Sequence, residues 1–153
     1  MRTTQVAYEA DGWGVGELVV SGGRVVWHEL PHPTLRTEPT GSHEIAEMLQ
    51  AYFAGEDVEL AGVAVDLEYD SPFFNRCAEA LRAIPRGEVV TYGELAALAR
   101  APGAARAAGT FCARNRLGLF VPCHRVVAAG GLGSYGSYGI EYKQRLLELE
   151  GAL

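Results

Sequence analysis

The change of residue pattern near Ser71 constrains the fold of this chain more than any other feature. Before it, short alternating apolar runs are separated by turn residues, as in "TQVAYEA" and in "GELVV" and "RVVWHEL", which flank "SGG". That pattern predicts a small antiparallel sheet with a hairpin at the glycines. After Ser71, apolar residues recur at helical spacing. Strands first and helices afterwards indicate an α+β fold, with an N-terminal lobe over 1–69 and a mostly helical C-terminal lobe over 70–153.

The N-terminal lobe contains two further patterns. Residues 43–54, "HEIAEMLQAYFA", carry apolar side chains at helical spacing and predict one helix. Residues 63–69, "VAVDLEY", predict a strand that leads into a linker near Asp70.

The C-terminal lobe contains clear helix start signals. Ser71 and Pro72 form an N-cap and first position, and "TYGE" at 91–94 matches a capping box that opens a helix through about Arg100. After "APG", a second short helix is predicted over 104–114, and a last one over 141–150. Two short helices joined by a tight glycine-containing turn indicate a helix-turn-helix, although such pairs also occur in proteins that bind no DNA.

Composition places the chain among globular proteins without a membrane span. Its 153 residues are 48% hydrophobic, and they contain no apolar run of about 18 residues. The start, "MRTTQVAYEADGWG", lacks the basic and apolar regions of a signal peptide. We therefore expect a cytoplasmic protein with no membrane partner.

The charge is distributed unevenly. The net charge of −6 argues against nucleic acid, but residues 1–69 hold three arginines against twelve acidic residues, a net −9, whereas residues 70–153 hold ten basic against seven acidic residues, a net +3. This asymmetry suggests different partners for the two lobes. Charge alone leaves DNA binding open, because acidic surfaces also serve solubility.

One apolar stretch, "FVPCHRVV" at 120–127, places a cysteine beside a histidine. The three cysteines, Cys77, Cys112 and Cys123, cannot all pair within one chain and form no C-x-x-C motif, so no disulfide framework or metal site is expected. Cys77 and Cys112 lie among apolar residues of predicted helices, where core packing explains them. Cys123 is either another buried small side chain or a nucleophile.

A nucleophilic role for Cys123 has a geometric requirement. A cysteine reacts as its thiolate, and an ordinary pKa of about 8.5 leaves little thiolate at neutral pH without a neighbouring base or positive charge. Adjacent side chains of an extended chain point to opposite faces, so His124 reaches Cys123 only through a sharp turn or a bridging water. Pro122 favours a turn at this point.

The sequence resembles a known family at several places. "VPCHRVV" is similar to the active-site motif of the O6-alkylguanine-DNA alkyltransferases, also called methylated-DNA–protein-cysteine methyltransferases. "GEVVTYGELAALA", "AARAAG", an asparagine eight residues before the cysteine, and the closing "LLELEG" follow in the family's order. The resemblance covers about 71–151. The first 70 residues resemble the family's variable N-terminal lobe only in pattern, which implies a ribonuclease-H-like lobe.

The resemblance implies a set of catalytic residues. Cys123 matches the nucleophile that takes the alkyl group from O6 of guanine. His124 matches the histidine that acts on it through a bound water, and Glu150 matches the acid that orients this histidine, the usual relation of nucleophile, base and orienting group. Asn115 matches the asparagine that holds the turn around the cysteine segment, but Arg116 replaces the proline that usually follows it.

The resemblance also implies how DNA is handled. The damaged base is flipped out of the duplex from the minor-groove side, and Arg106 matches the arginine that fills the vacancy. Tyr92 matches the tyrosine that helps to rotate the nucleotide, and amides near Gly93 are expected to meet a phosphate. Ser137 is our choice for the loop residue whose backbone amide meets O6, although Tyr138 stands where the family usually has glycine.

The implied function is direct DNA repair: a monomer binds double-stranded DNA containing O6-alkylguanine, transfers the alkyl group irreversibly to Cys123, and is consumed. No metal or organic cofactor is expected. Two alternatives belong to other classes. One is a non-enzymatic binder of alkylated DNA, whose representatives keep the helix-turn-helix and arginine but lack the cysteine. The other is a cysteine hydrolase, which no further motif supports.

Overall fold

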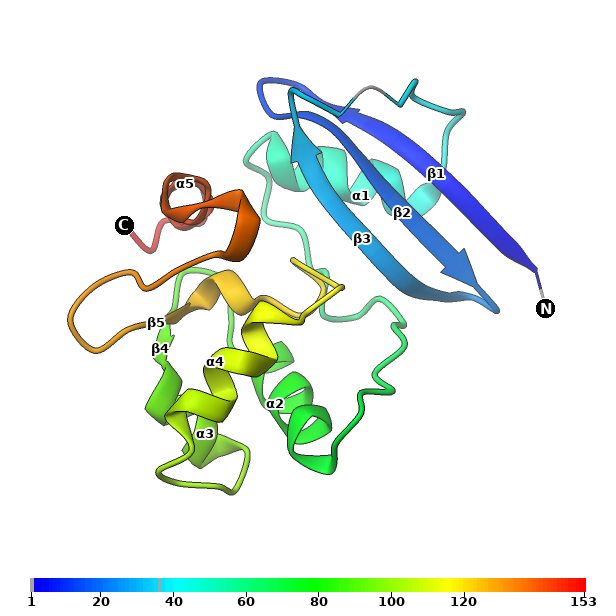
Figure 1. The fold of residues 1–153 in the computed structure, drawn as a ribbon. Helices are drawn as coiled ribbons and strands as arrows, with labels where there is room; N and C mark the ends of the chain where they lie inside the picture. Colours follow the sequence, from blue (N-terminus) through cyan, green and yellow to red (C-terminus); the bar gives the residue numbers. More distant parts are fainter. Residues whose placement is uncertain (1, 36) are drawn as a thin grey trace. The chain divides into compact units, whose positions relative to one another are not determined.

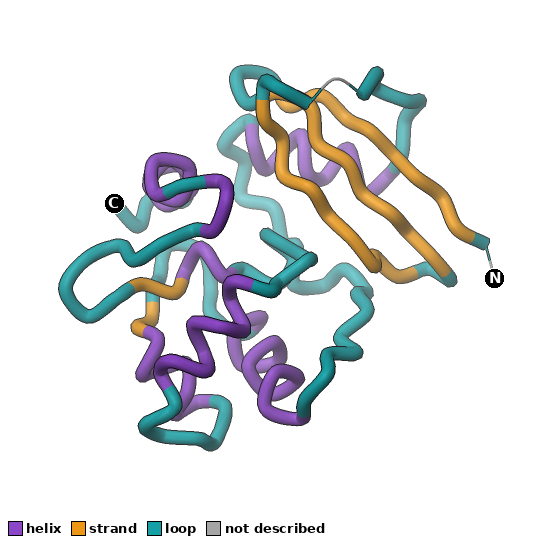
Figure 2. Tube along the Cα trace, viewed as in Figure 1, coloured by secondary structure: helices purple, strands orange, loops and turns teal. Residues whose placement is uncertain are grey.

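The computed structural model describes residues 2–35 and 37–153, and these residues form two compact units. The N-terminal unit contains the residues up to Asp66 together with Arg116–Phe120. The C-terminal unit contains Leu67–Asn115 and Val121–Leu153. Strands dominate the first unit, whereas helices and loops dominate the second (Figure 2). The α+β class expected from the sequence is therefore confirmed.

Three antiparallel strands form the sheet of the N-terminal unit in the order β1 (Thr3–Ala10), β2 (Gly14–Ser21) and β3 (Arg24–His32). The predicted hairpin is confirmed, since Ser21 pairs with Arg24 and the two glycines between them have positive φ. Gly14 is required for another reason. A Cβ at this position would lie 2.2 Å from the backbone carbon of His32.

One helix, α1 (Glu44–Phe53), covers one face of this sheet (Figure 1). It starts at His43, whose ring nitrogen accepts a hydrogen bond from the backbone amide of Ile45, and it ends one residue before the predicted position 54. Its apolar stripe is buried against the inner face of the strands and forms the core of the unit, with Leu18, Val25, Leu49, Tyr52 and Phe53 among its members.

The outer edge of β3 is covered by two short segments instead of a fourth strand. Val25 exchanges hydrogen bonds with residues 64 and 66, and the amide of His28 donates to the carbonyl of Arg116 at 2.9 Å. The prediction of a strand over 63–69 was therefore wrong, because this segment pairs with β3 only at Val65. The next position on that edge is occupied by the chain at Arg116 and Leu117, so the pairing cannot continue.

The C-terminal unit consists of packed helices and one small parallel pair of strands. The predicted start signals are confirmed: Ser71 Oγ accepts from the amide of Phe74, and Thr91 and Glu94 form a reciprocal capping box. The pairing of Val90–Thr91 with Val126–Val127 was not predicted, because strands of two residues leave no period. The elements are α2 (Pro72–Arg82), β4 (Val90–Thr91), α3 (Tyr92–Leu98), α4 (Ala105–Ala113), β5 (Val126–Val127) and α5 (Ile140–Leu149).

None of the helices within 2–35 and 37–153 combines the length and the apolar character needed to cross a bilayer.

Candidate active site around Cys123

The backbone at Cys123 forms a single tight turn. Residues Cys123–Arg125 are one 3₁₀ turn, η1, which is closed by a hydrogen bond from the amide of Arg125 to the carbonyl of Pro122. The chain continues directly into β5, which pairs with β4 at the start of α3. The turn expected from Pro122 is therefore present, and the side chains of Cys123 and His124 are not forced onto opposite faces.

An asparagine amide faces the sulfur of Cys123. Asn115 Nδ2 donates to Cys123 Sγ at 3.2 Å and to the carbonyl of Val121 at 2.8 Å. The hydroxyl of Tyr69 donates to Asn115 Oδ1 at 3.3 Å, and this contact fixes the amide so that its nitrogen faces the sulfur. The structure thus brings Asn115 and Cys123 together, as the sequence predicted.

The ionisation of Cys123 depends on opposing effects. Its side chain is only 7% exposed, and burial raises the pKa of the thiol. The Asn115 amide, the Lys143 ammonium and the buried hydroxyl of Tyr135 each favour the thiolate and oppose that rise. Free thiol is therefore the resting form, and a base is needed to remove its proton.

His124 provides a base in a defined tautomer. Its ring is fully buried, and Nε2 lies 2.8 Å from Glu150 Oε2. Because burial lowers the pKa of His124 despite the adjacent carboxylate, the ring is neutral with its proton on Nε2. Its other nitrogen, Nδ1, has no hydrogen-bond partner within the described part of the chain. That nitrogen can accept a proton, directly or through a water.

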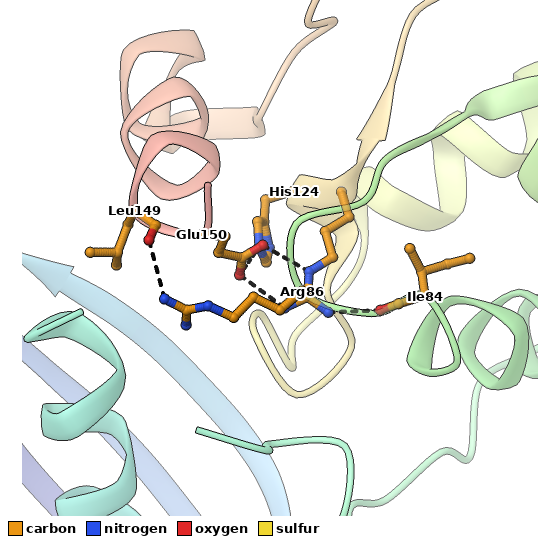
Figure 3. A network of polar contacts seen from close by, with 6 residues as sticks. Ile84, Arg86, His124, Leu149 and Glu150 are labelled. Atoms are coloured by element: carbon orange, nitrogen blue, oxygen red, sulfur yellow. Dashed lines mark hydrogen bonds and ion pairs between the residues drawn. The ribbon is translucent and has the colours of Figure 1, made fainter. Parts of the chain in front are cut away.

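Arg125 holds Glu150 ionised together with His124, and Arg86 binds the neighbouring backbone (Figure 3). Arg125 donates to both carboxylate oxygens at 2.9 Å and to the carbonyl of Ile84 at 2.8 Å, and Arg86 donates to the carbonyl of Leu149 at 3.1 Å. Burial alone would raise the pKa of the carboxyl. The hydrogen bonds from His124 and Arg125 outweigh it and hold the pKa far below its ordinary value.

Lys143 lies close to the site and was missed in the sequence. Its side chain is fully buried, Nζ donates to the carbonyl of Ser134 at 3.1 Å, and the ammonium lies 5.7 Å from the centre of the Tyr92 ring. Burial lowers the pKa of Lys143, and the thiols of Cys112 and Cys123 oppose that shift. The available signal was spacing: Lys143 shares one face of α5 with Leu146, Leu147 and Glu150.

The loop before α5 brings a tyrosine, and not a serine, to the buried side. Tyr135 is buried beside the cysteine, whereas Ser137 is exposed in the short turn η2 (Gly136–Tyr138). Gly133 is needed here, because it has a φ of +80° and a Cβ would lie 3.0 Å from the hydroxyl of Tyr92. No repeating pattern in this loop indicated which of these side chains is buried.

Three of the residues expected to contact DNA lie on α3 and α4. Tyr92 and Gly93 are the first residues of α3, and burial raises the pKa of the Tyr92 hydroxyl. Arg106 is the second residue of α4 and is exposed. Gly109 lies on α4 opposite the Tyr92 ring, which a Cβ there would approach at 3.9 Å. The two helices pack directly against each other.

Comparison with known proteins identifies the family. Residues 72–152 match the family model of the 6-O-methylguanine DNA methyltransferase DNA binding domain. The chain belongs to the O6-methylguanine DNA methyltransferase family. A methylated-DNA–protein-cysteine methyltransferase of Methanopyrus kandleri is 44% identical over 111 residues, which are 72% of this chain and 82% of that protein.

Solved structures of this family have the same fold. The crystal structure of Mycobacterium tuberculosis O6-methylguanine methyltransferase has a TM-score of 0.83 at 33% identity and covers 99% of this chain and 94% of its own. The crystal structure of Mycobacterium tuberculosis OGT in complex with DNA has a TM-score of 0.80 at 37% identity, with 97% and 92% covered.

Proposed function

We propose that this methyltransferase repairs DNA by transferring the alkyl group of O6-alkylguanine, chiefly O6-methylguanine, to Sγ of its own Cys123. Membership of the family gives the reaction, a direct transfer from DNA to a protein cysteine. The observation that carries the assignment to Cys123 is its surroundings. An amide donates to the sulfur, and the next residue is a buried neutral imidazole whose Nδ1 has no hydrogen-bond partner among residues 2–35 and 37–153.

The reaction follows from these groups. His124 Nδ1 takes the thiol proton through a bridging water, and the imidazolium so formed lies against the Glu150 carboxylate. The thiolate attacks the alkyl carbon, the S–C bond forms, and the C–O6 bond breaks with its electron pair on the guanine. The imidazolium of His124 then gives up this proton, and the guanine takes up one proton and becomes neutral. The thioether has no leaving group that water can displace, so each molecule acts once.

DNA recognition is assigned to α3 and α4, acting as a helix-turn-helix of a C-terminal DNA-binding and alkyl-transfer domain over 70–153. Arg106 occupies the space of the flipped nucleotide from the minor groove, and Tyr92 contacts the base. The capping box already uses the amides of Thr91 and Glu94, so those of Tyr92 and Gly93 are the candidates for a phosphate. The amide of Ser137 remains our candidate for O6.

The remaining parts of the proposal concern the fold class, assembly and cellular location. The N-terminal unit is assigned to the ribonuclease-H-like class, and the protein works as a monomer in the cytoplasm. A binder without chemistry is not favoured, because such a protein would have no use for a thiol, a base and an orienting carboxylate in one cluster.

Mass spectrometry tests the proposal. Incubation with duplex DNA containing O6-methylguanine should raise the protein mass by one methylene, located on the peptide that contains Cys123. The matched variant Cys123→Ala should bind the same duplex and gain no mass. Methylation of Cys77 or Cys112 in the native protein, or transfer by Cys123→Ala, would refute the assignment.

A further inference from the structure

The segment that precedes Cys123 leaves the C-terminal unit and returns to it. Asn115 and Val121 both belong to that unit and are joined by the hydrogen bond from Asn115 Nδ2 to the Val121 carbonyl at 2.8 Å. The residues between them, Arg116–Phe120, belong to the N-terminal unit. The base of this loop is therefore held beside the nucleophile, and its outer part is held by residues of the sheet.

His28 on β3 makes the central contacts to that outer part. Its backbone amide donates to the carbonyl of Arg116 at 2.9 Å, and β3 forms a parallel bridge with this segment between His28 and Leu117. Its ring nitrogen Nδ1 lies 2.7 Å from the carbonyl of Gly118, and Nε2 lies 2.6 Å from the hydroxyl of Tyr8. His28 thus contacts four of the five residues from Arg116 to Phe120, since the ring of Phe120 also packs edge-on against the imidazole, with 5.3 Å between the ring centres.

The directions of these hydrogen bonds are fixed by chemistry. A carbonyl only accepts, so His28 Nδ1 carries the proton and donates to Gly118. Nε2 is then the acceptor and receives the proton of the Tyr8 hydroxyl. The ring is 3% exposed, and burial lowers its pKa to about 4, so it stays neutral at physiological pH. Each polar group of this side chain has one partner.

The loop needs such an anchor. Leu119, next to Gly118, has a φ of +74°, a backbone conformation that residues other than glycine rarely adopt. It persists because both neighbours are fixed, Gly118 by the His28 ring and Phe120 by burial. Two residues further on, the carbonyl of Val121 accepts hydrogen bonds from Asn115 Nδ2 and from the amide of Cys123.

We propose that His28 is a positioning residue for Cys123: by holding the carbonyl of Gly118 it fixes the path of residues 118–121, and with it the Val121 carbonyl on which Asn115 and Cys123 are aligned. This role rests on Cys123 being the acceptor, as proposed above. Through this role the acidic N-terminal unit affects the reactivity of Cys123, which belongs to the other unit, by way of the covalent connection at residues 118–121 alone.

Two substitutions separate the contact to Gly118 from the contact to Tyr8. In His28→Asn, the side-chain NH₂ takes the place of Nδ1 and can still donate to Gly118. In His28→Gln, the amide reaches the place of Nε2 and the donor to Gly118 is lost. The rate of Cys123 carbamidomethylation by iodoacetamide is measured from pH 6 to 10 by peptide mass, and methyl transfer from O6-methylguanine duplex is measured in parallel.

We expect His28→Gln to lose roughly tenfold in both rates, with its pH midpoint raised because the Asn115 contact to the sulfur is weakened. His28→Asn should stay within about twofold of the native rates. Leu49→Ala, a core change in α1, controls for lost stability and should keep the native pH midpoint. If His28→Gln does not fold, Tyr8→Phe carries the test. It keeps the donor to Gly118 and loses only the contact to Nε2, so it should stay within about twofold of the native rates, and a tenfold loss would overturn the inference.

Equal losses in His28→Asn and His28→Gln, or a native rate and midpoint in His28→Gln, would overturn the inference. A raised midpoint in Leu49→Ala would do the same. The iodoacetamide measurement stays readable if the native protein fails to accept methyl groups from DNA. Such a failure would count against the proposed function and not against the positioning role.

Discussion

Asn115→Ala is the substitution whose effect on Cys123 follows most directly from the structure. It removes the donor at 3.2 Å from Sγ. A hydrogen bond to a charged group contributes about 1.5–3 kcal/mol, and each 1.4 kcal/mol is about a factor of ten in an equilibrium. Since Cys123 is 7% exposed, water cannot replace the lost donor well. The thiolate population at neutral pH should therefore fall roughly ten- to a hundredfold, and methyl transfer with it.

The assay is single-turnover methyl transfer from O6-methylguanine duplex, measured between pH 6 and 10 with DNA in excess. The pH midpoint of Asn115→Ala should lie above that of the native protein, because ionisation is what the variant loses. Tyr69→Phe is the matched control: it keeps the donor but loses the hydroxyl that orients it, so its defect should be smaller. An Asn115→Ala midpoint equal to the native one would show that Asn115 does not act through ionisation.

Three further predictions test the neighbouring groups. Glu150→Gln should slow transfer and flatten the fall of Tm at acid pH. The pKa of Glu150 in the folded protein lies below its unfolded value of about 4.3, so the ionised carboxylate stabilises the fold fully above that pH. This stabilisation is lost as the pH falls, and a variant that shows the native fall of Tm would contradict the reasoning. Lys143→Met should slow alkylation of Cys123 roughly tenfold by removing a cation that favours the thiolate, while Lys143→Arg keeps more activity; equal rates would contradict this. Arg106→Ala should slow repair of duplex DNA more than reaction with free O6-methylguanine, as stopped-flow and mass measurements can compare, and equal losses would argue against a role in base flipping.

The sequence predicted the parts of the fold that have a repeating pattern. The hairpin at the two glycines, the helix after His43 and the capped helices after Ser71 and Thr91 all have local signals, and all are present. The failure at 63–69 has a different origin. An alternating run predicts a strand only if a free edge exists, and the edge of β3 beyond Val25 is occupied by residues far along the chain.

The residues of the candidate site also differ in how much of a signal they leave in the sequence. Cys123, His124 and Glu150 were found through a motif and a closing helix, and the structure joins Cys123 to Asn115 and His124 to Glu150. Lys143 was readable from its place on the buried face of α5, but a lysine in that row is ordinarily expected in solvent. His28 carried no signal, because its partner Gly118 is 90 residues away and offers only a backbone carbonyl.

The burial of Cys123 has a consequence for a protein that is spent in one reaction. A thiol that is hardly exposed and mostly protonated at rest is a poor target for the oxidants and small electrophiles that a cell always contains. The same burial that makes a base necessary for activation also protects the thiol between encounters with damaged DNA. The number of active molecules therefore falls with the number of lesions repaired and not through side reactions of the cysteine.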